Sequence, residues 1–150
     1  MNSAGIPEDA DLAVACPATF EGRVSSVDRL LALSQPPTAV VAAQDLVAIG
    51  AHSAARRHGL RVPDDFSVVG FDNIRDAELI EPHLTTVASP LVSLGSAAVN
   101  HLLKTRRDGP GHEPVLLPAR LVSRDTVGPP GGDHGNSRQL FPAGPGPRRG

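Results

Sequence analysis

Between residues 38 and 72, two apolar runs of strand length flank one stretch with helical periodicity. The first run, Thr38 to Ala43, is continuous and rich in β-branched and small residues, which is typical of a parallel strand covered on both faces. Leu46 to His58 carries the helical pattern, and the second run, Ser67 to Phe71, ends on Asp72. This order predicts a βαβ unit with parallel strands and a right-handed connection.

Polar and turn-forming residues mark where the elements of this unit begin and end. Asp45 precedes the helical pattern, so we expect its carboxylate to be the N-cap. Gly59 follows the pattern, where many helices end in a left-handed residue, and Pro63 marks a turn before the second strand. These local signals agree with the same three elements.

The two strands of the unit end on polar side chains, Gln44 and Asp72. Ligands of parallel α/β sheets bind beyond the carboxyl ends of the strands, so we expect these side chains to lie side by side in a binding site. Each has an alternative interpretation. Asp72 could cap the turn that follows it, and Gln44 could be a solvent-facing amide beside an N-cap.

A further strand and helix are predicted upstream. Leu12 to Ala15 is a short apolar run that we expect to form a buried strand. Thr19 or Glu21 precedes a helical pattern that ends near Ser34, because the prolines at 36 and 37 cannot continue it. The organisation up to Asp72 is therefore β-α-β-α-β, with three parallel strands.

After residue 72 the pattern predicts shorter elements. They are a short helix or turn at Asn73 to Glu81, a strand at Thr85 to Val87, a helix at Leu91 to Arg107, and strands at Val115 to Leu117 and Arg120 to Ser123. From Gly128 to Gly150 the chain is mostly Gly, Pro and charged residues, which cannot offset their ordering entropy. We therefore expect one partial domain over 1-127 and a disordered tail over 128-150.

Composition excludes several kinds of protein. The chain has 150 residues, the length of one domain, and 40% of them are hydrophobic. Its 14 Lys and Arg against 16 Asp and Glu give a formal charge of -2, so we expect no direct contact with nucleic acid. The single cysteine, Cys16, fits a reducing compartment, and no leader or membrane-spanning run is present, so we expect a cytoplasmic protein without membrane contact.

The sequence lacks the arrangements typical of catalysis and of metal binding. Cys16 and the six His have no other ligand at metal-binding spacing on the same element. No nucleophile elbow surrounds a serine, and no dinucleotide or P-loop glycine pattern is present, since Gly50 falls within a helix and Gly70 within a strand. We therefore expect neither enzymatic activity nor a cofactor.

Three segments carry a resemblance to a known family. They are Pro37 to Ala51 (PTAVVAAQDLVAIGA), Gly59 to Asn73 (GLRVPDDFSVVGFDN) and Leu84 to Val87 (LTTV). In this order and spacing they resemble the C-terminal half of the lactose-repressor/galactose-repressor (LacI/GalR) family of bacterial transcription regulators, over a match from Gly5 to Pro130. The resemblance implies an α/β fold, the parallel-sheet sandwich of type I periplasmic-binding-protein-like domains, with the C-terminal subdomain only.

The resemblance also implies an effector site for a small polar ligand, a sugar or a related metabolite. Asp72 stands at the family's effector-binding carboxylate, and Gln44 replaces the usual asparagine. Phe71 is expected either in the core or with its edge toward the ligand. Ser89 stands where the family has a glutamine, and Ala18 where it has an aromatic residue, which removes a stacking contact that sugar sites often use.

Dimerisation is a second implication of the resemblance. A homodimer, or a mixed dimer with another family member, is implied to use the helix Leu46 to His58 and the segment Arg75 to His83. Within that helix we expect the contact face to carry Val47, Ala51 and Ala54. The DNA-binding domain and the N-terminal sensor subdomain of a full family member lie upstream of the matched segments.

The helix Leu91 to Arg107 corresponds to one that packs in the N-terminal subdomain of the family. We therefore expect an orphan helix whose apolar face, with Leu94, Ala98 and Leu102, is exposed or loosely packed. Two functions remain open. The chain is either an effector-sensing fragment that binds ligand and forms the dimer, or a truncated remnant that dimerises with full-length regulators without sensing ligand.

Overall fold

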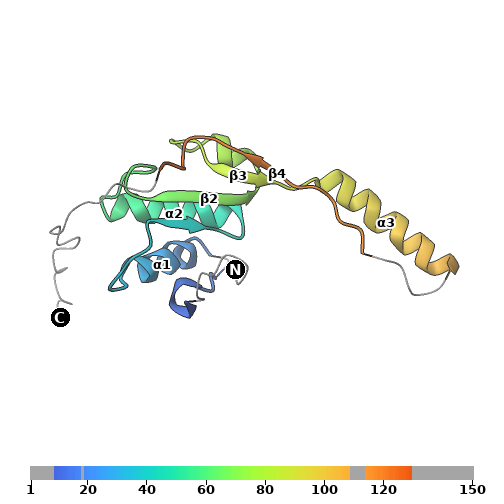
Figure 1. Cartoon of the computed structure of the whole chain (residues 1–150), viewed down its shortest axis with the longest axis horizontal. Helices are drawn as coiled ribbons and strands as arrows, with labels where there is room; N and C mark the ends of the chain where they lie inside the picture. The colour runs from blue at the N-terminus through green and yellow to red at the C-terminus, as the bar shows by residue number, and fades with distance from the viewer. Residues whose placement is uncertain (1–8, 18, 109–113, 130–150) are drawn as a thin grey trace.

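The computed structural model describes residues 9-17, 19-108 and 114-129. Its elements are η2 (Ala10–Leu12), α1 (Phe20–Leu31), β1 (Ala39–Val41), α2 (Asp45–Arg57), β2 (Ser67–Asp72), η3 (Arg75–Glu78), β3 (Thr85–Ala88), α3 (Leu91–Asp108) and β4 (Arg120–Val122). The sheet has the order β1-β2-β3-β4, in which the first three strands are parallel and β4 is antiparallel to β3. Figure 1 shows α1 and α2 on one side of this sheet and α3 pointing away from it. The α/β class with a mainly parallel sheet is confirmed.

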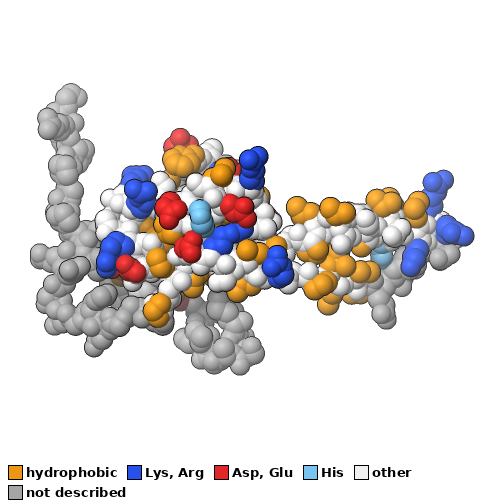
Figure 2. Space-filling model, turned by 90° about the horizontal axis from the view of Figure 1, so that it is seen from above, with side chains coloured by type: hydrophobic (Ala, Val, Ile, Leu, Met, Phe, Trp, Pro, Cys, Tyr) orange, Lys and Arg blue, Asp and Glu red, His pale blue; other side chains and the backbone are white. Residues whose placement is uncertain are grey.

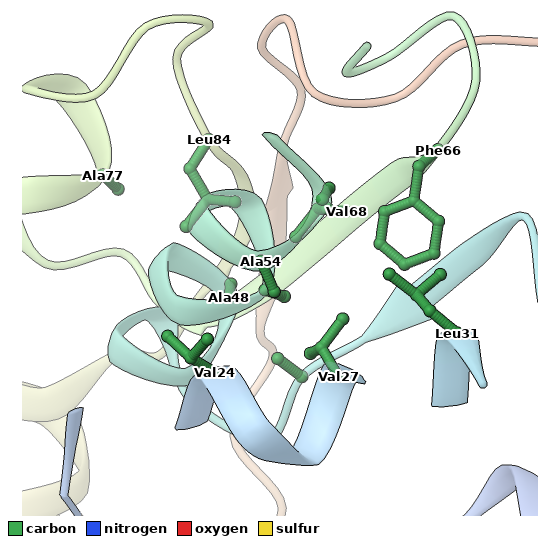
Figure 3. Close-up of a cluster of buried hydrophobic side chains, with 12 residues drawn as sticks. Val24, Val27, Leu31, Ala48, Ala54, Phe66, Val68, Ala77 and Leu84 are labelled. Carbon is green, nitrogen blue, oxygen red and sulfur yellow. The ribbon is translucent and has the colours of Figure 1, made fainter. Parts of the chain in front are cut away.

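The core lies between the sheet, α2 and α1, and small residues bring these layers together. Its buried members are Val24, Val27, Leu31, Ala42, Ala48, Ala51, Ala54, Ala55, Phe66, Val68, Ala77 and Leu84. Figure 3 shows the ring of Phe66 close above Leu31, with Val68 and Val27 nearby. Burying a side chain such as Phe66 contributes about 1.5 to 3 kcal/mol, so this ring is a main contact between the sheet side and α1.

Local signals set the ends of both core helices. Thr19 is the N-cap of α1, because its hydroxyl accepts the N–H of Gly22 at 3.0 Å. Helix α2 ends just before Gly59, whose φ of +74° is the left-handed conformation expected of a residue that follows a helix. The two helices are also joined by His58, whose Nε2 lies 2.7 Å from the Asp28 carboxylate. The predicted βαβ unit is confirmed.

One face of the sheet is uncovered, contrary to the expectation for the first strand. Val41 pairs with Val69 and Phe71 with Val87, so by strand alternation these residues share the face opposite α2. Val41 is 80% exposed, and Leu121, which pairs with Val87, is exposed as well. The prediction that Thr38 to Ala43 is a strand covered on both faces is therefore wrong, because β1 is a short edge strand with one layer of helices.

Two further predicted strands are absent from the described residues. The prediction that Leu12 to Ala15 is a buried strand is wrong, because Ala10–Leu12 is a 3-10 turn capped by the Asp9 carboxylate and residues 13-17 form no strand. Val115 to Leu117 lies in an extended segment that pairs with no strand, and Leu116 is 92% exposed. Both runs are apolar enough for a strand, but neither has a neighbouring strand with which to exchange hydrogen bonds.

The orphan helix is confirmed as α3. It packs extensively against no other helix or strand of the described chain, and its large apolar side chains are exposed: Leu91, Val92, Leu94, Val99, Leu102 and Leu103. Figure 2 shows hydrophobic side chains along this helix and Lys and Arg side chains toward its tip. Of the predicted tail, the N–H of Gly128 donates to the Ser67 hydroxyl at 3.2 Å, and residues 130-150 lie outside the described residues.

Candidate functional site

The carboxyl ends of three neighbouring strands bring the predicted site residues together. In the β1–β2 register Val41 pairs with Val69, and Gln44 and Asp72 follow three residues beyond these partners. On the other side Asp72 pairs with Ala88, the residue before Ser89. The expectation that the tips of the first two strands lie side by side is confirmed, and Asp72 occupies the middle position, between Gln44 and Ser89.

Asp72 has an unusual backbone and a carboxylate without a partner. Its φ is +113°, and that of Asn73 is +57°. Such values cost about 1 to 3 kcal/mol each for residues other than Gly and concentrate at functional sites. The half-buried carboxylate makes no hydrogen bond or ion pair with any residue that the structure describes. Its oxygens are therefore able to accept hydrogen bonds from another molecule.

The other predicted site residues surround Asp72 in different ways. Gln44 is the N-cap of α2, but its exposed amide makes no capping hydrogen bond and remains available to a ligand. Ser89 is half-buried. Phe71 is 39% exposed on the open face of the sheet, so the core interpretation of this ring is wrong. Ala18, the position of the missing aromatic residue, lies outside the described residues.

Asp45 is not the N-cap that the sequence predicted. It is the first residue of α2 and is fully buried, and its Oδ2 accepts the N–H of Ile74 at 2.8 Å while its Oδ1 accepts the Thr86 hydroxyl at 2.5 Å. A Cβ added at Gly70 would lie 2.2 Å from Oδ1, so the glycine makes room for this carboxylate. Asp45 therefore connects the start of α2 to the turn after β2 and to β3.

Arg124 is a second site-related residue that sequence reasoning missed. Its Nη2 donates to Asn73 Oδ1 at 2.9 Å and to Glu78 Oε1 at 2.7 Å, and its Nη1 donates to the carbonyl of Leu84 at 2.8 Å. Nothing in the local pattern pointed to Arg124, because these partners are at least 40 residues away in sequence. The buried role of Asp45 had one signal in the sequence, which is the glycine at position 70 of a predicted buried strand, where a missing side chain leaves space for a neighbour.

The chemistry of the strand tips is that of reversible binding. An amide, a carboxylate and a hydroxyl can together hold a ligand that offers hydroxyl or amine donors. Within the described ranges, no group of three or more His, Cys, Asp or Glu could hold a metal ion. No described helix is both long and apolar enough to cross a membrane.

A separate hollow of about 580 Å³ lies where α1, α2 and the segment after η3 meet. Its lining residues are Phe20, Ile49, His52, Ser53, Arg56, Arg57, Ile80 and Glu81. His52 is only 6% exposed, and its Nε2 has no hydrogen-bond partner among the residues described. Burial, and secondarily the charge of Arg56, lower the pKa of His52.

Burial corrects the expected contact face of α2 at two of its three residues, and the third, Val47, is half-buried against the core. Ala51 and Ala54 are fully buried in the core, so neither can touch a second protein. The accessible side of α2 instead carries Ile49, Ser53 and Arg56, which line the hollow.

Comparison with known proteins places these features in context. Residues 1–127 match the family described as periplasmic binding protein-like domain. The HTH-type transcriptional repressor CytR of Escherichia coli is 47% identical over 85 residues, which are 57% of this chain and 25% of CytR. The HTH-type transcriptional regulator DegA of Bacillus subtilis is 35% identical over 130 residues, which are 86% of this chain and 38% of DegA. The chain thus spans well under half of either relative.

Solved structures agree with the sequence relatives. A LacI transcriptional regulator from Bacillus cereus subsp. cytotoxis superposes with a TM-score of 0.77 at 30% identity, covering 85% of this chain and 45% of that one. A LacI family regulator from Enterococcus faecium with bound ribose gives a TM-score of 0.69 at 29% identity, with coverages of 85% and 47%. The regulator CelR in complex with cellobiose gives 0.72 at 32% identity, with coverages of 83% and 38%.

Proposed function

The chain belongs to the periplasmic binding protein-like domain family, as found in LacI-type regulators, and from this premise we propose that it senses a small polar effector at the tips of β1, β2 and β3. The observation that carries the proposal is the unpartnered carboxylate of Asp72, placed between Gln44 and Ser89 at the carboxyl ends of adjacent parallel strands. Because two of the related structures hold ribose and cellobiose, we propose a sugar or a related polyhydroxy metabolite as the effector.

Each residue of the site has a proposed part in binding. The Asp72 carboxylate accepts hydrogen bonds from ligand hydroxyl or amine groups, and one such bond to a charged group contributes about 1.5 to 3 kcal/mol. That contribution corresponds to roughly tenfold to hundredfold in affinity. The Gln44 amide can both donate and accept, the Ser89 hydroxyl closes the far side, and the exposed edge of Phe71 offers an apolar contact.

The open geometry sets an upper limit on affinity. Ligand pockets usually bury most of the surface of a small ligand. The three strand tips form one wall, and the chain spans less than half of the related structures that it matches. We therefore propose weak effector binding by this chain alone, one partial sensor domain over 1-127 with a tail after it, and a cytoplasmic place of action without direct DNA contact.

We also propose that the hollow between α1, α2 and the segment after η3 is the seam of a dimer. A two-fold interface places the same surface on both partners, so it must complement itself. The hollow combines cationic Arg56 and Arg57 with anionic Glu81 around apolar Phe20 and Ile80, which supports the proposal because both signs of charge are available for pairing across the axis. Effector binding would then shift the population between two arrangements of this dimer.

Replacing Asp72 tests the proposed effector site. D-ribose and cellobiose, each at millimolar concentration, are titrated into the full chain while the unfolding temperature is recorded. We expect a saturable upward shift with at least one of these sugars, because ligand that binds only the folded state stabilises it. Asp72→Asn should lower the apparent affinity roughly tenfold or more.

The matched control is Asp125→Asn, which neutralises an exposed carboxylate away from the strand tips. It should leave the shift unchanged. A shift that survives Asp72→Asn would remove Asp72 from the site. Absence of any shift with both sugars would favour the alternative, a remnant that dimerises with full-length regulators without sensing ligand.

A further inference from the structure

The turn that carries Asp72 needs support from elsewhere in the fold. Asp72 and Asn73 both have positive φ angles, so their backbone is in a region that residues other than Gly adopt only when surrounding contacts enforce it. The direction of the Asp72 carboxylate depends on this backbone. Whatever holds the turn therefore determines where the carboxylate lies.

Three side chains hold the turn from three different elements. Asp45, at the start of α2, accepts the N–H of Ile74 at 2.8 Å. Thr86, on β3, accepts the N–H of Asn73 at 3.4 Å, and its own hydroxyl donates to Asp45. Arg124, just after β4, donates to the Asn73 side chain at 2.9 Å. Of these three side chains, Arg124 alone forms its hydrogen bond with the side chain of a positive-φ residue, whereas the other two bind backbone N–H groups.

The guanidinium of Arg124 is itself fixed by independent contacts. It donates to the carbonyl of Leu84 and to Glu78, and its side chain is only 13% exposed. Its own N–H donates to the Thr85 hydroxyl at 2.9 Å. A planar guanidinium held by several hydrogen bonds has little rotational freedom. It therefore fixes the Asn73 side-chain amide relative to the beginning of β3 and to η3.

We propose that Arg124 is a positioning residue of the effector site, which acts through Asn73 to hold the left-handed turn and so aims the Asp72 carboxylate at the ligand. This inference rests on the proposed function. Arg124 does not touch the ligand. A lysine at position 124 would keep the positive charge, but it cannot reproduce the fork that reaches Asn73, Glu78 and Leu84 together.

Amide hydrogen exchange in the ligand-free chain tests the first half of the proposal. In Arg124→Lys, the amides of Asn73 and Ile74 should exchange roughly tenfold faster or more, since opening of the turn becomes easier. The amide of Ala42, a buried core residue whose N–H donates to the Val69 carbonyl at 2.8 Å, reports the stability of the core away from the segment of Arg124. It should change by much less. If Arg124 only stabilised the fold as a whole, all three amides would exchange faster by the same factor, and that result would overturn the proposal.

Titration with D-ribose and cellobiose tests the second half. Arg124→Lys should weaken binding about tenfold in a chain that still carries Asp72. Arg61→Lys, which alters an exposed arginine paired with Asp64 and Asp65, is the control and should leave binding unchanged. Unchanged affinity in Arg124→Lys, beside a loss in Asp72→Asn, would overturn positioning and leave the effector site standing. If the unaltered chain binds neither sugar, the effector function fails, and the exchange result alone decides whether Arg124 holds the turn.

Discussion

At the scale of single residues, the described chain contains one buried side chain whose polar atom lacks a partner. Leaving a buried donor or acceptor unsatisfied costs about 1 to 3 kcal/mol. The Nε2 of His52 is such an atom, and it belongs to a residue that lines the hollow on α2. Its persistence in the fold means that the surrounding contacts, with a neutral imidazole, outweigh this cost.

His52 should make the stability of the chain depend on pH. In the unfolded chain His52 takes up a proton near its ordinary pKa of 6.5, whereas the fold lowers the pKa of His52, so that the folded chain takes up this proton only at a lower pH. The unfolded state therefore binds more protons below about pH 6.5, and the free energy of unfolding should fall as the pH drops from there toward the folded pKa. Urea unfolding at a series of pH values measures this slope.

In His52→Leu the slope below about pH 6.5 should become shallower. His83→Gln, at an exposed position, serves as the control and should retain more of the slope. An unchanged slope in His52→Leu would mean that other groups cause the pH dependence.

At the scale of elements, local pattern was sufficient for some features and insufficient for others. The βαβ unit and its strand-end residues follow from periodicity and turn chemistry, which are encoded in neighbouring residues. The strand expected at Leu12 to Ala15 and the two-sided burial of β1 depend on which segments lie alongside, and a single sequence does not specify this. The same reason hid Arg124, whose partners come from distant parts of the chain.

The role of Asp45 differs from the predicted N-cap for a related reason. A carboxylate at the start of a helix is most simply an N-cap, but here tertiary contacts from Ile74 and Thr86 replace that local role. Gly70 on β2 leaves the space that Asp45 fills. The α2–β2 contact therefore includes a complementary pair, Gly70 without a side chain and Asp45 with a buried carboxylate.

This pair predicts the effect of Gly70→Ala. The added Cβ would lie 2.2 Å from Asp45 Oδ1, so the carboxylate or the strand must shift. We expect a loss of about 1 to 3 kcal/mol in the free energy of unfolding, measured by urea titration. Gly95→Ala on α3, where a Cβ meets nothing within 4 Å, is the control and should be neutral or slightly stabilising. Equal stability of both variants would show that Asp45 can move away without cost.

At the scale of the whole molecule, two surfaces could join chains to one another. One is the hollow on α2, which is concave and combines both signs of charge. The other is the apolar face of α3 together with the segment that includes Leu116, where the large apolar side chains Leu94, Leu102 and Leu116 are exposed. We assign the first to the proposed dimer seam because it carries both signs of charge, and the second to nonspecific association because it is apolar.

Phe20→Glu separates these two kinds of association. Phe20 is exposed at the rim of the hollow, so a charge there should weaken a seam dimer about tenfold or more, with little effect on the fold. Sedimentation equilibrium measures the dimer dissociation constant. Leu116→Glu should leave this constant unchanged while reducing higher aggregates. A strict monomer at high concentration in the unaltered chain would contradict the seam.

The pairing of β3 with β4 allows the projecting part of the chain to be excised by design. Ala88 and Arg120 are directly paired antiparallel neighbours, although 31 residues, 89-119, lie between them in sequence. Two antiparallel strands can be joined by a two-residue loop such as Asn-Gly. A shortened chain could therefore be made by replacing residues 89-119 with a tight hairpin. It would keep Arg124 and both core helices, and it would lose α3 and Ser89.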